Sequence, residues 1–287
     1  MRRLALFGNL ILLHLVSFSQ NLHLGVFGGA SAYTGDLVEK IFPKKLTNGV
    51  IGVTANYELQ DQFFIRAGFN YSVLGGDDKY SKDTALQHRN LSFETSIAEF
   101  SLVGEYYVFN LYNQKFSPYV FGGLAIYHFN PYAYDRNGQQ VFLKPLSTEG
   151  QGLSQYPDRK PYSLTQLALP LGGGIKYAFS DNLRLGLELG LRKLFTDYLD
   201  DISTTYVDYN DLLAAKGQLA VDMAYRGNEV AGGNPNYPGK NITRGGEKFK
   251  DWYYFAGLHL TFRIGAGGGG FQFMSSKKKF GCPSVPQ

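Results

Sequence analysis

The sequence predicts an all-β protein: an eight-stranded antiparallel transmembrane β-barrel with long extracellular loops and a short periplasmic C-terminal tail. Three observations point to this fold class. Several segments, such as NLRLGLELGLRKLF at 182–195, alternate strictly between apolar residues and charged residues or glycine, which gives a strand two different faces. Short and long connections alternate along the chain. The chain also opens with the pattern of an export signal.

Residues 1–19 have the features of a signal peptide. A basic start is followed by an apolar stretch over 4–16 and by the small residues Ser17 and Ser19. We expect cleavage after Ser19, so that Gln20 becomes the N-terminus of an exported chain. No cysteine adjoins this site, which argues against a lipoprotein signal.

Residues 20–264 are expected to form the barrel. The predicted strands are 22–33, 49–59, 63–73, 100–109, 118–130, 164–179, 182–195 and 252–265. The short connections are 59–62, 110–117 and 179–182, and the long ones are about 34–48, 74–92, 131–163 and 196–250. Outer-membrane barrels have short periplasmic turns and long extracellular loops, whereas a soluble sandwich has no reason for this alternation.

The register of each strand follows from its surroundings. In hydrocarbon every backbone polar group must be paired within the protein, so the sheet must close. An Arg facing lipid at the bilayer midplane costs roughly 2–4 kcal/mol, so the apolar face must turn outward. The charged residues then expected in the lumen are Arg66, Glu99, Glu105, Lys176, Arg184, Glu188, Arg192, His259 and Arg263.

Eight strands enclose a space that side chains just fill. We therefore expect the lumen charges to form a plug of ion pairs and hydrogen bonds, with a narrow conducting pore as the alternative. Aromatic residues also suit girdles at the membrane borders, although ordinary strand propensity explains them equally well. These residues are Tyr57, Tyr71, Tyr106, Tyr177, Trp252 and Tyr254.

The composition excludes several classes of protein. The net charge of +4 is modest, and no basic stripe with interleaved aromatics is present, so we expect no nucleic-acid partner. Generous counts of Gly (35), Tyr (21) and Phe (22) beside a single Cys favour many strands and turns over a disulfide scaffold.

No cofactor or metal site is predicted. The acidic segment 197–211 could hold calcium, but its spacing does not match a calcium-binding loop, and a solvated loop explains it as well. Its acids are Asp197, Asp200, Asp201, Asp208 and Asp211. The run GAGGGG at 265–270 lacks the Lys-Ser/Thr of a phosphate-binding loop and is typical of a flexible linker.

No catalytic site is predicted either. Beyond residue 20 the histidines are His23, His88, His128 and His259, and none has a recognisable nucleophile beside it. We expect a protein that is not an enzyme.

Residues 265–287 run past the last strand. Because that strand descends, we expect this tail in the periplasm. It combines a glycine hinge with Lys277, Lys278, Lys279, Phe280 and the only cysteine, Cys282. An odd cysteine in an exported chain suggests an intermolecular disulfide or a free thiol. We expect a partner to bind these residues, and a tail with an incidental cysteine is the alternative.

Four stretches resemble a known family. They are GASAYTGDL, NLSFETSIAEFSLVGEYY, YVFGGLAIYHFNP and LRKLFTDYLDDISTTYVD. Together they look like the PorG-like (DUF6089) outer-membrane barrels of the type IX secretion system of Bacteroidetes-type bacteria, and the likeness covers nearly the whole chain after residue 19.

The resemblance implies a barrel whose periplasmic side anchors a ring built from a lipoprotein (PorK) and its partner (PorN). That system exports proteins with a C-terminal sorting domain and supports gliding in some species. The resemblance further implies that the tail bonds or docks to the ring lipoprotein through Cys282.

Two other functions stay open. One is an OmpA/OmpW-like barrel that binds at the cell surface, with loops 131–163 and 196–250 acting as adhesin or receptor. The other is a small porin. The surface-binding barrel and the periplasmic anchor differ in which part of the chain carries the function. The first would use the loops, and the second would use the tail.

Overall fold

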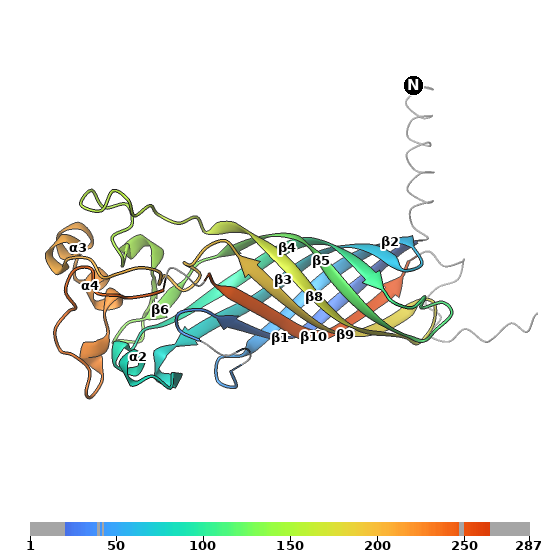
Figure 1. Ribbon diagram of the computed structural model, residues 1–287, viewed down its shortest axis with the longest axis horizontal. Helices are drawn as coiled ribbons and strands as arrows, with labels where there is room; N and C mark the ends of the chain where they lie inside the picture. The colour runs from blue at the N-terminus through green and yellow to red at the C-terminus, as the bar shows by residue number, and fades with distance from the viewer. Residues whose placement is uncertain (1–20, 39–40, 42, 247–249, 265–287) are drawn as a thin grey trace, which may run out of the picture.

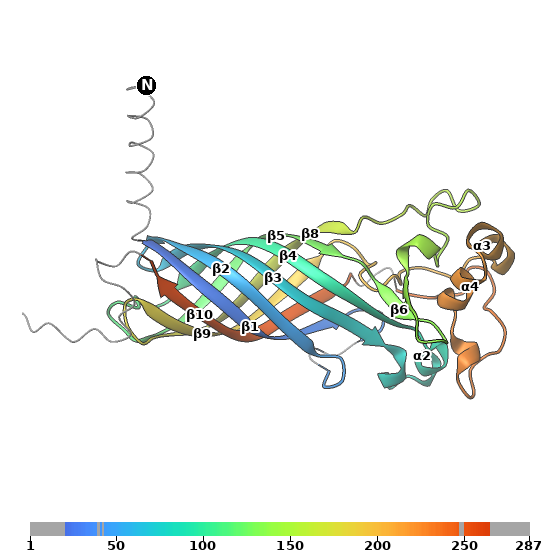
Figure 2. The same ribbon diagram turned by 180° about the vertical axis from the view of Figure 1, so that it is seen from behind.

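The computed structural model describes residues 21–38, 41, 43–246 and 250–264. The expected signal peptide and the partner-binding residues expected in 265–287 lie outside the described residues. Eight long strands form the body of the molecule (Figures 1 and 2). They are β1 (Leu22–Thr34), β2 (Asn48–Gln60), β3 (Phe63–Asp77), β4 (Ser92–Tyr107), β5 (Phe116–Phe129), β8 (Thr165–Ala178), β9 (Leu183–Leu194) and β10 (Trp252–Arg263).

The strands close into a barrel. Each long strand pairs antiparallel with the next one along the chain. The last strand, β10, pairs back with β1 from Thr34 opposite Trp252 to His23 opposite Arg263. The eight-stranded antiparallel barrel predicted from the sequence is confirmed.

The outer face of the barrel is apolar. Ile51, Leu187 and Leu258 are 68%, 60% and 53% exposed, whereas Arg184 and Glu188 on the same strand as Leu187 are buried. A soluble protein places its apolar residues the other way round. This inversion suits a barrel surrounded by hydrocarbon and holds the register of each strand, because a slip of one residue would exchange the two faces.

Short and long connections gather at opposite ends of the barrel (Figure 1). The short turns are 61–62, 108–115 and 179–182, at the end where β1 begins. The long connections, 35–47, 78–91, 130–164 and 195–251, lie at the other end and are together called the cap.

The cap has secondary structure of its own. It contains α2 (Thr84–Arg89), α3 (Tyr209–Lys216), α4 (Gln218–Ala224), a small hairpin of β6 (Tyr132–Tyr134) and β7 (Gln140–Phe142), and the 3-10 turns η2 (Asp78–Tyr80), η3 (Lys144–Leu146) and η4 (Gly227–Glu229). Among the described residues, no helix has the length and apolar character needed to cross a membrane.

Two strands run further into the cap than predicted. β3 continues to Asp77, and β4 begins at Ser92 instead of 100. In the added part of β4, Phe93 and Ile97 point inward and are buried. A tilted strand needs only about 9–11 residues to cross the hydrocarbon, so these strands of 15 and 16 residues rise beyond it. The prediction missed the extension because it sought apolar residues on the outer face.

An aromatic stack joins the cap to the barrel. The ring of Phe129, at the end of β5, lies 6.2 Å from that of Tyr162, which stacks on Tyr198 at 4.9 Å. A second core, inside the cap, includes Val207 and Leu212. The cap is therefore packed onto the barrel and does not consist of independent loops.

Candidate functional site

The centre of the lumen holds a network of opposite charges. Arg66 Nε lies 3.0 Å from Glu105 Oε1, and Arg66 Nη1 lies 2.6 Å from Glu188 Oε2. Lys176 Nζ lies 3.8 Å from Glu105 Oε2. Two cations therefore face two carboxylates, and the group is neutral as a whole.

Neutral side chains complete the central network. Each carboxylate also accepts a hydrogen bond from a buried tyrosine, from Tyr107 at 2.7 Å and from Tyr119 at 2.6 Å. His259 Nε2 lies 2.8 Å from the hydroxyl of Thr54. Such bonds offset part of the cost of removing the charges from water.

One triad in this network has the residue types of a metal site. Ligand atoms of Glu105, Glu188 and His259 lie within 4.8 Å of one another. However, Arg66 Nη1 lies 3.3 Å from His259 Nδ1, and Lys176 lies beside Glu105. Because these two cations already neutralise the carboxylates, the triad belongs to the ion-pair network.

A second network lies closer to the cap. Glu99 faces Arg192, with Nε to Oε2 at 3.0 Å and Nη2 to Oε1 at 3.2 Å. Tyr253 Oη and Asn70 Nδ2 donate to the same carboxylate at 2.6 and 3.0 Å. This two-point contact of guanidinium and carboxylate is a strong geometry for a buried pair.

The two remaining arginines lie toward the end with the short turns. Arg184 is buried, and its guanidinium stacks over the rings of Phe64 and Tyr112 at 5.5 and 4.9 Å. Arg263 is half-buried, with Nη1 3.3 Å from the Tyr112 hydroxyl. All nine predicted charges thus lie in the lumen, but Arg184 makes cation–π contacts where an ion pair was expected.

The centre of the lumen is filled. A cavity at this level, lined by Phe27, Phe121 and Pro170 among others, has a volume of about 10 Å³, which is room for about one water molecule. Glycine makes part of this packing possible: a Cβ at Gly190 would lie 2.7 Å from Arg192 Nη1. These dimensions favour the predicted plug over the conducting pore.

Sequence reasoning missed several lumen residues on β1 and β5. His23 and Tyr33 of β1 point inward, as do Tyr119 and Phe121 of β5, and all four are buried. Glycine on the outer face and aromatics on the inner face hide the alternation in these strands. Counting in steps of two along each strand does place His23 with Tyr33, and Tyr119 with Phe121, on a common face.

The four histidines beyond residue 20 lie in three separate places. His23 and His259 are buried in the lumen. His128 lies on the outer face of β5, where Nδ1 is 3.0 Å from Thr165 Oγ1. His88 belongs to α2 in the cap.

The acidic segment 197–211 does not converge on one point. Asp208 caps α3 by accepting a bond from Asn210 N at 2.8 Å. Asp211 accepts from the Tyr156 hydroxyl at 2.8 Å. Protein donors therefore use carboxylates that a calcium ion would need.

A buried acidic pair ties the cap to β1. The Tyr33 hydroxyl lies 2.6 Å from Asp200 Oδ2 and 3.1 Å from Asp251 Oδ1. Burial and the neighbouring carboxylates raise the pKa of Asp200 and Asp251 well above the ordinary value. Burial likewise raises the pKa of Asp197 and Asp201 to about 6. The cap therefore favours protonated carboxyl groups here.

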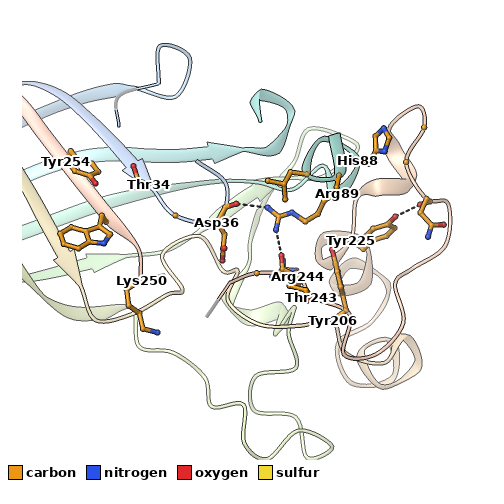
Figure 3. A pocket seen from close by; sticks show the side chains of 18 of the residues that line it. Thr34, Asp36, His88, Arg89, Tyr206, Tyr225, Thr243, Arg244, Lys250 and Tyr254 are labelled. Carbon is orange, nitrogen blue, oxygen red and sulfur yellow. Dashed lines mark hydrogen bonds between the residues drawn. The ribbon is translucent and has the colours of Figure 1, made fainter. Parts of the chain in front are cut away.

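A pocket of about 1350 Å³ opens between the cap and the ends of β1, β9 and β10 (Figure 3). Arg89 fastens one wall, with Nε 2.7 Å from Asp78 Oδ2 and Nη2 donating to the Asp36 carbonyl at 3.2 Å. Arg244 fastens another, with Nη1 2.9 Å from Glu149 Oε1. The guanidinium groups of both arginines are therefore occupied by contacts within the protein.

The sequence matches the model of the family described as "Domain of unknown function (DUF6089)" over residues 3–225. No curated protein matches it.

Several solved structures are similar. Neisserial surface protein A (NspA) has 9% sequence identity and a TM-score of 0.42, covering 85% of this chain and 97% of that one. Ail of Yersinia pestis has 8% identity and a TM-score of 0.39, with 85% and 97% covered. OprG from Pseudomonas aeruginosa has 11% identity and a TM-score of 0.40, with 85% and 98% covered.

Proposed function

The chain belongs to the DUF6089 family, and on that premise we propose that it is a non-enzymatic structural barrel of a Gram-negative outer membrane that anchors a periplasmic assembly. The assembly we propose is the lipoprotein ring of the type IX secretion system, in a Bacteroidetes-type bacterium. Its members would be a PorK-like lipoprotein and its PorN-like partner. The resemblance of four sequence stretches to the PorG-like barrels supports this choice.

The filled lumen is the observation that carries the structural role. Arg66 of β3 pairs with Glu105 of the adjacent β4 and, across the lumen, with Glu188 of β9, and a second pair joins β4 to β9. The cavity beside Phe27, Phe121 and Pro170 has a volume of only about 10 Å³. A body cross-linked in this way suits a rigid anchor better than a channel.

Attachment is proposed through residues 265–287. Lys277, Lys278 and Lys279 would attract an acidic surface, and Cys282 would form a disulfide in the oxidising periplasm. The short turns lie at the end of the barrel where the chain leaves β10, so they would form the rest of the contact.

A non-reducing gel of outer membranes tests this attachment. Wild-type protein should give a band of higher mass that contains a periplasmic lipoprotein. Reductant and Cys282→Ser should each remove that band. A monomer band in both samples would exclude the covalent link.

A surface-binding barrel is the second candidate. It is favoured by the cap, which has its own core and a large pocket. Purified barrel added to host-cell or matrix surfaces would bind in this case, and shaving the cap with protease would abolish the binding. Failure of purified barrel to bind any such surface would remove this candidate.

A further inference from the structure

The lining of the pocket in Figure 3 includes residues on the outer face of β9 and β10. On the outer face of β9, the exposed Leu189 is followed by Leu191 and then Lys193. Leu191 lies opposite Tyr254 and Lys193 lies opposite Trp252 on β10. Lys193, Trp252 and Tyr254 all line the pocket. The wall therefore changes from aliphatic to aromatic and basic as it reaches the cap.

The lining has an excess of positive charge. Its cations are Arg89, Lys193, Arg244 and Lys250, and among the described lining residues Asp36 is the acid. The Asp36 carboxylate already accepts from the backbone N–H of residue 246, at 3.0 and 3.1 Å. With Arg89 and Arg244 paired to Asp78 and Glu149, the two lysines still outnumber Asp36, so an anion in this pocket would meet more attraction than repulsion.

The two lysines are the cations left to bind a ligand. The arginines pair with Asp78 and Glu149, whereas neither lysine has a carboxylate within 4.0 Å in the part of the chain that the structure describes. Burial raises the pKa of Asp197, and Lys250 opposes this rise through space, but the two do not form an ion pair. Both lysine side chains are exposed.

We propose that this pocket binds the phosphate-bearing sugar headgroup of an outer-leaflet lipid, with Lys193 and Lys250 facing phosphate and Trp252 and Tyr254 at headgroup level. Basic side chains attract anionic headgroups, and Trp and Tyr favour the membrane border. The volume exceeds the roughly 300–1,000 Å³ of typical small-molecule pockets, which suits several sugar rings. The site requires only that the barrel lies in an outer membrane and is independent of the anchor function.

Trp252 supplies a direct probe, because it is the only tryptophan in the chain. Purified full-length protein in neutral detergent is titrated with lipid A, a diphosphorylated sugar lipid, while tryptophan fluorescence is recorded. We expect a saturable change. Lys193→Gln with Lys250→Gln should weaken binding by roughly 10- to 30-fold, given the usual contribution of a basic residue beside anionic lipid.

The matched control is Lys115→Gln with Lys160→Gln. These lysines are exposed, lie outside the pocket and change the net charge equally. The control should bind as the wild type does, and circular dichroism should show the same strand content in all three proteins. Equal weakening in both double variants, or no saturable change in the wild type, overturns the proposal.

Two further titrations identify the source of the phosphate. Lipid A stripped of its phosphates should bind at least about tenfold more weakly, since both lysine contacts are lost. If the stripped lipid binds as tightly as lipid A does, the proposed role of phosphate is overturned. An equal response to inorganic phosphate at the same concentration would show that the pocket binds a soluble anion, and it would overturn the proposal that the ligand is a lipid.

Discussion

Glu99 illustrates how this lumen holds charge away from water. Its two oxygens accept bonds from Arg192, Tyr253 and Asn70, so every donor comes from a neighbouring or facing strand. The residue is fully buried. A carboxylate in this position is stable only while its partners stay in place.

Replacing Glu99 tests this dependence. Glu99→Gln leaves the Arg192 guanidinium buried without a counter-charge, which should lower the free energy of unfolding by about 3 kcal/mol. Urea unfolding in lipid vesicles measures the change. Adding Arg192→Met should recover part of the loss, and Asp158→Asn, at an exposed cap residue, should have no effect. A loss below about 1 kcal/mol would show that the pair contributes little.

The raised pKa values of the cap carboxyls predict that the stability of the folded cap depends on pH. Asp197 and Asp201 keep their protons up to about pH 6 in the folded cap, against 3.8 ordinarily. Their contribution to stability is therefore complete below about pH 4 and is lost as the pH rises through about 6. Asp200 and Asp251, whose pKa values are raised further, extend the loss to higher pH.

Hydrogen exchange of the cap between pH 4 and pH 8 measures this effect, after correction for the intrinsic rate. Amides at 197–206 should lose protection as the pH rises. Asp201→Asn should flatten part of the trend, whereas barrel amides should not change. Greater cap protection at high pH would mean that these carboxyls are ionised in the fold.

At the scale of the strand, alternation decides which face meets lipid. β9 shows this most clearly, because Leu187 is exposed while Arg184 and Arg192 are buried on the other face. The same rule explains why the prediction worked best for strands with aliphatic residues on one side and charges on the other.

Substitution at the lipid face tests the register. Leu187→Arg should lower the free energy of unfolding in vesicles by roughly 2–4 kcal/mol, because it places a charge in hydrocarbon. Leu219→Arg on α4 is the matched control, since Leu219 is exposed but belongs to the cap. A similar small effect of both changes would place Leu187 outside the membrane.

The limits of the sequence-based prediction also have physical causes. The two faces of the strands and the nine lumen charges follow from local alternation, which depends only on neighbours in the chain, and closure follows from the need to pair every backbone group in hydrocarbon. The cap depends on contacts between distant residues, such as Arg244 with Glu149 and Tyr33 with Asp200. Alternation carries no information about such contacts, so the pocket and the buried acids could not be predicted.

For the molecule as a whole, the filled lumen predicts no ion flow. Purified protein in planar bilayers should give no discrete conductance steps, because buried ion pairs cross the lumen and the cavity beside them has room for about one water molecule. An eight-stranded barrel with an open lumen serves as the positive control. Reproducible steps that disappear when protein is omitted would favour the small porin.

Removal of residues 265–287 tests the central claim most directly. Full-length protein and a variant ending at Ile264 would be isolated from outer membranes without reductant, and the proteins that accompany each would be identified by mass spectrometry. We predict that both barrels fold to the same level and that the periplasmic lipoprotein accompanies the full-length protein alone. Equal recovery of the lipoprotein with both would contradict anchoring through the tail.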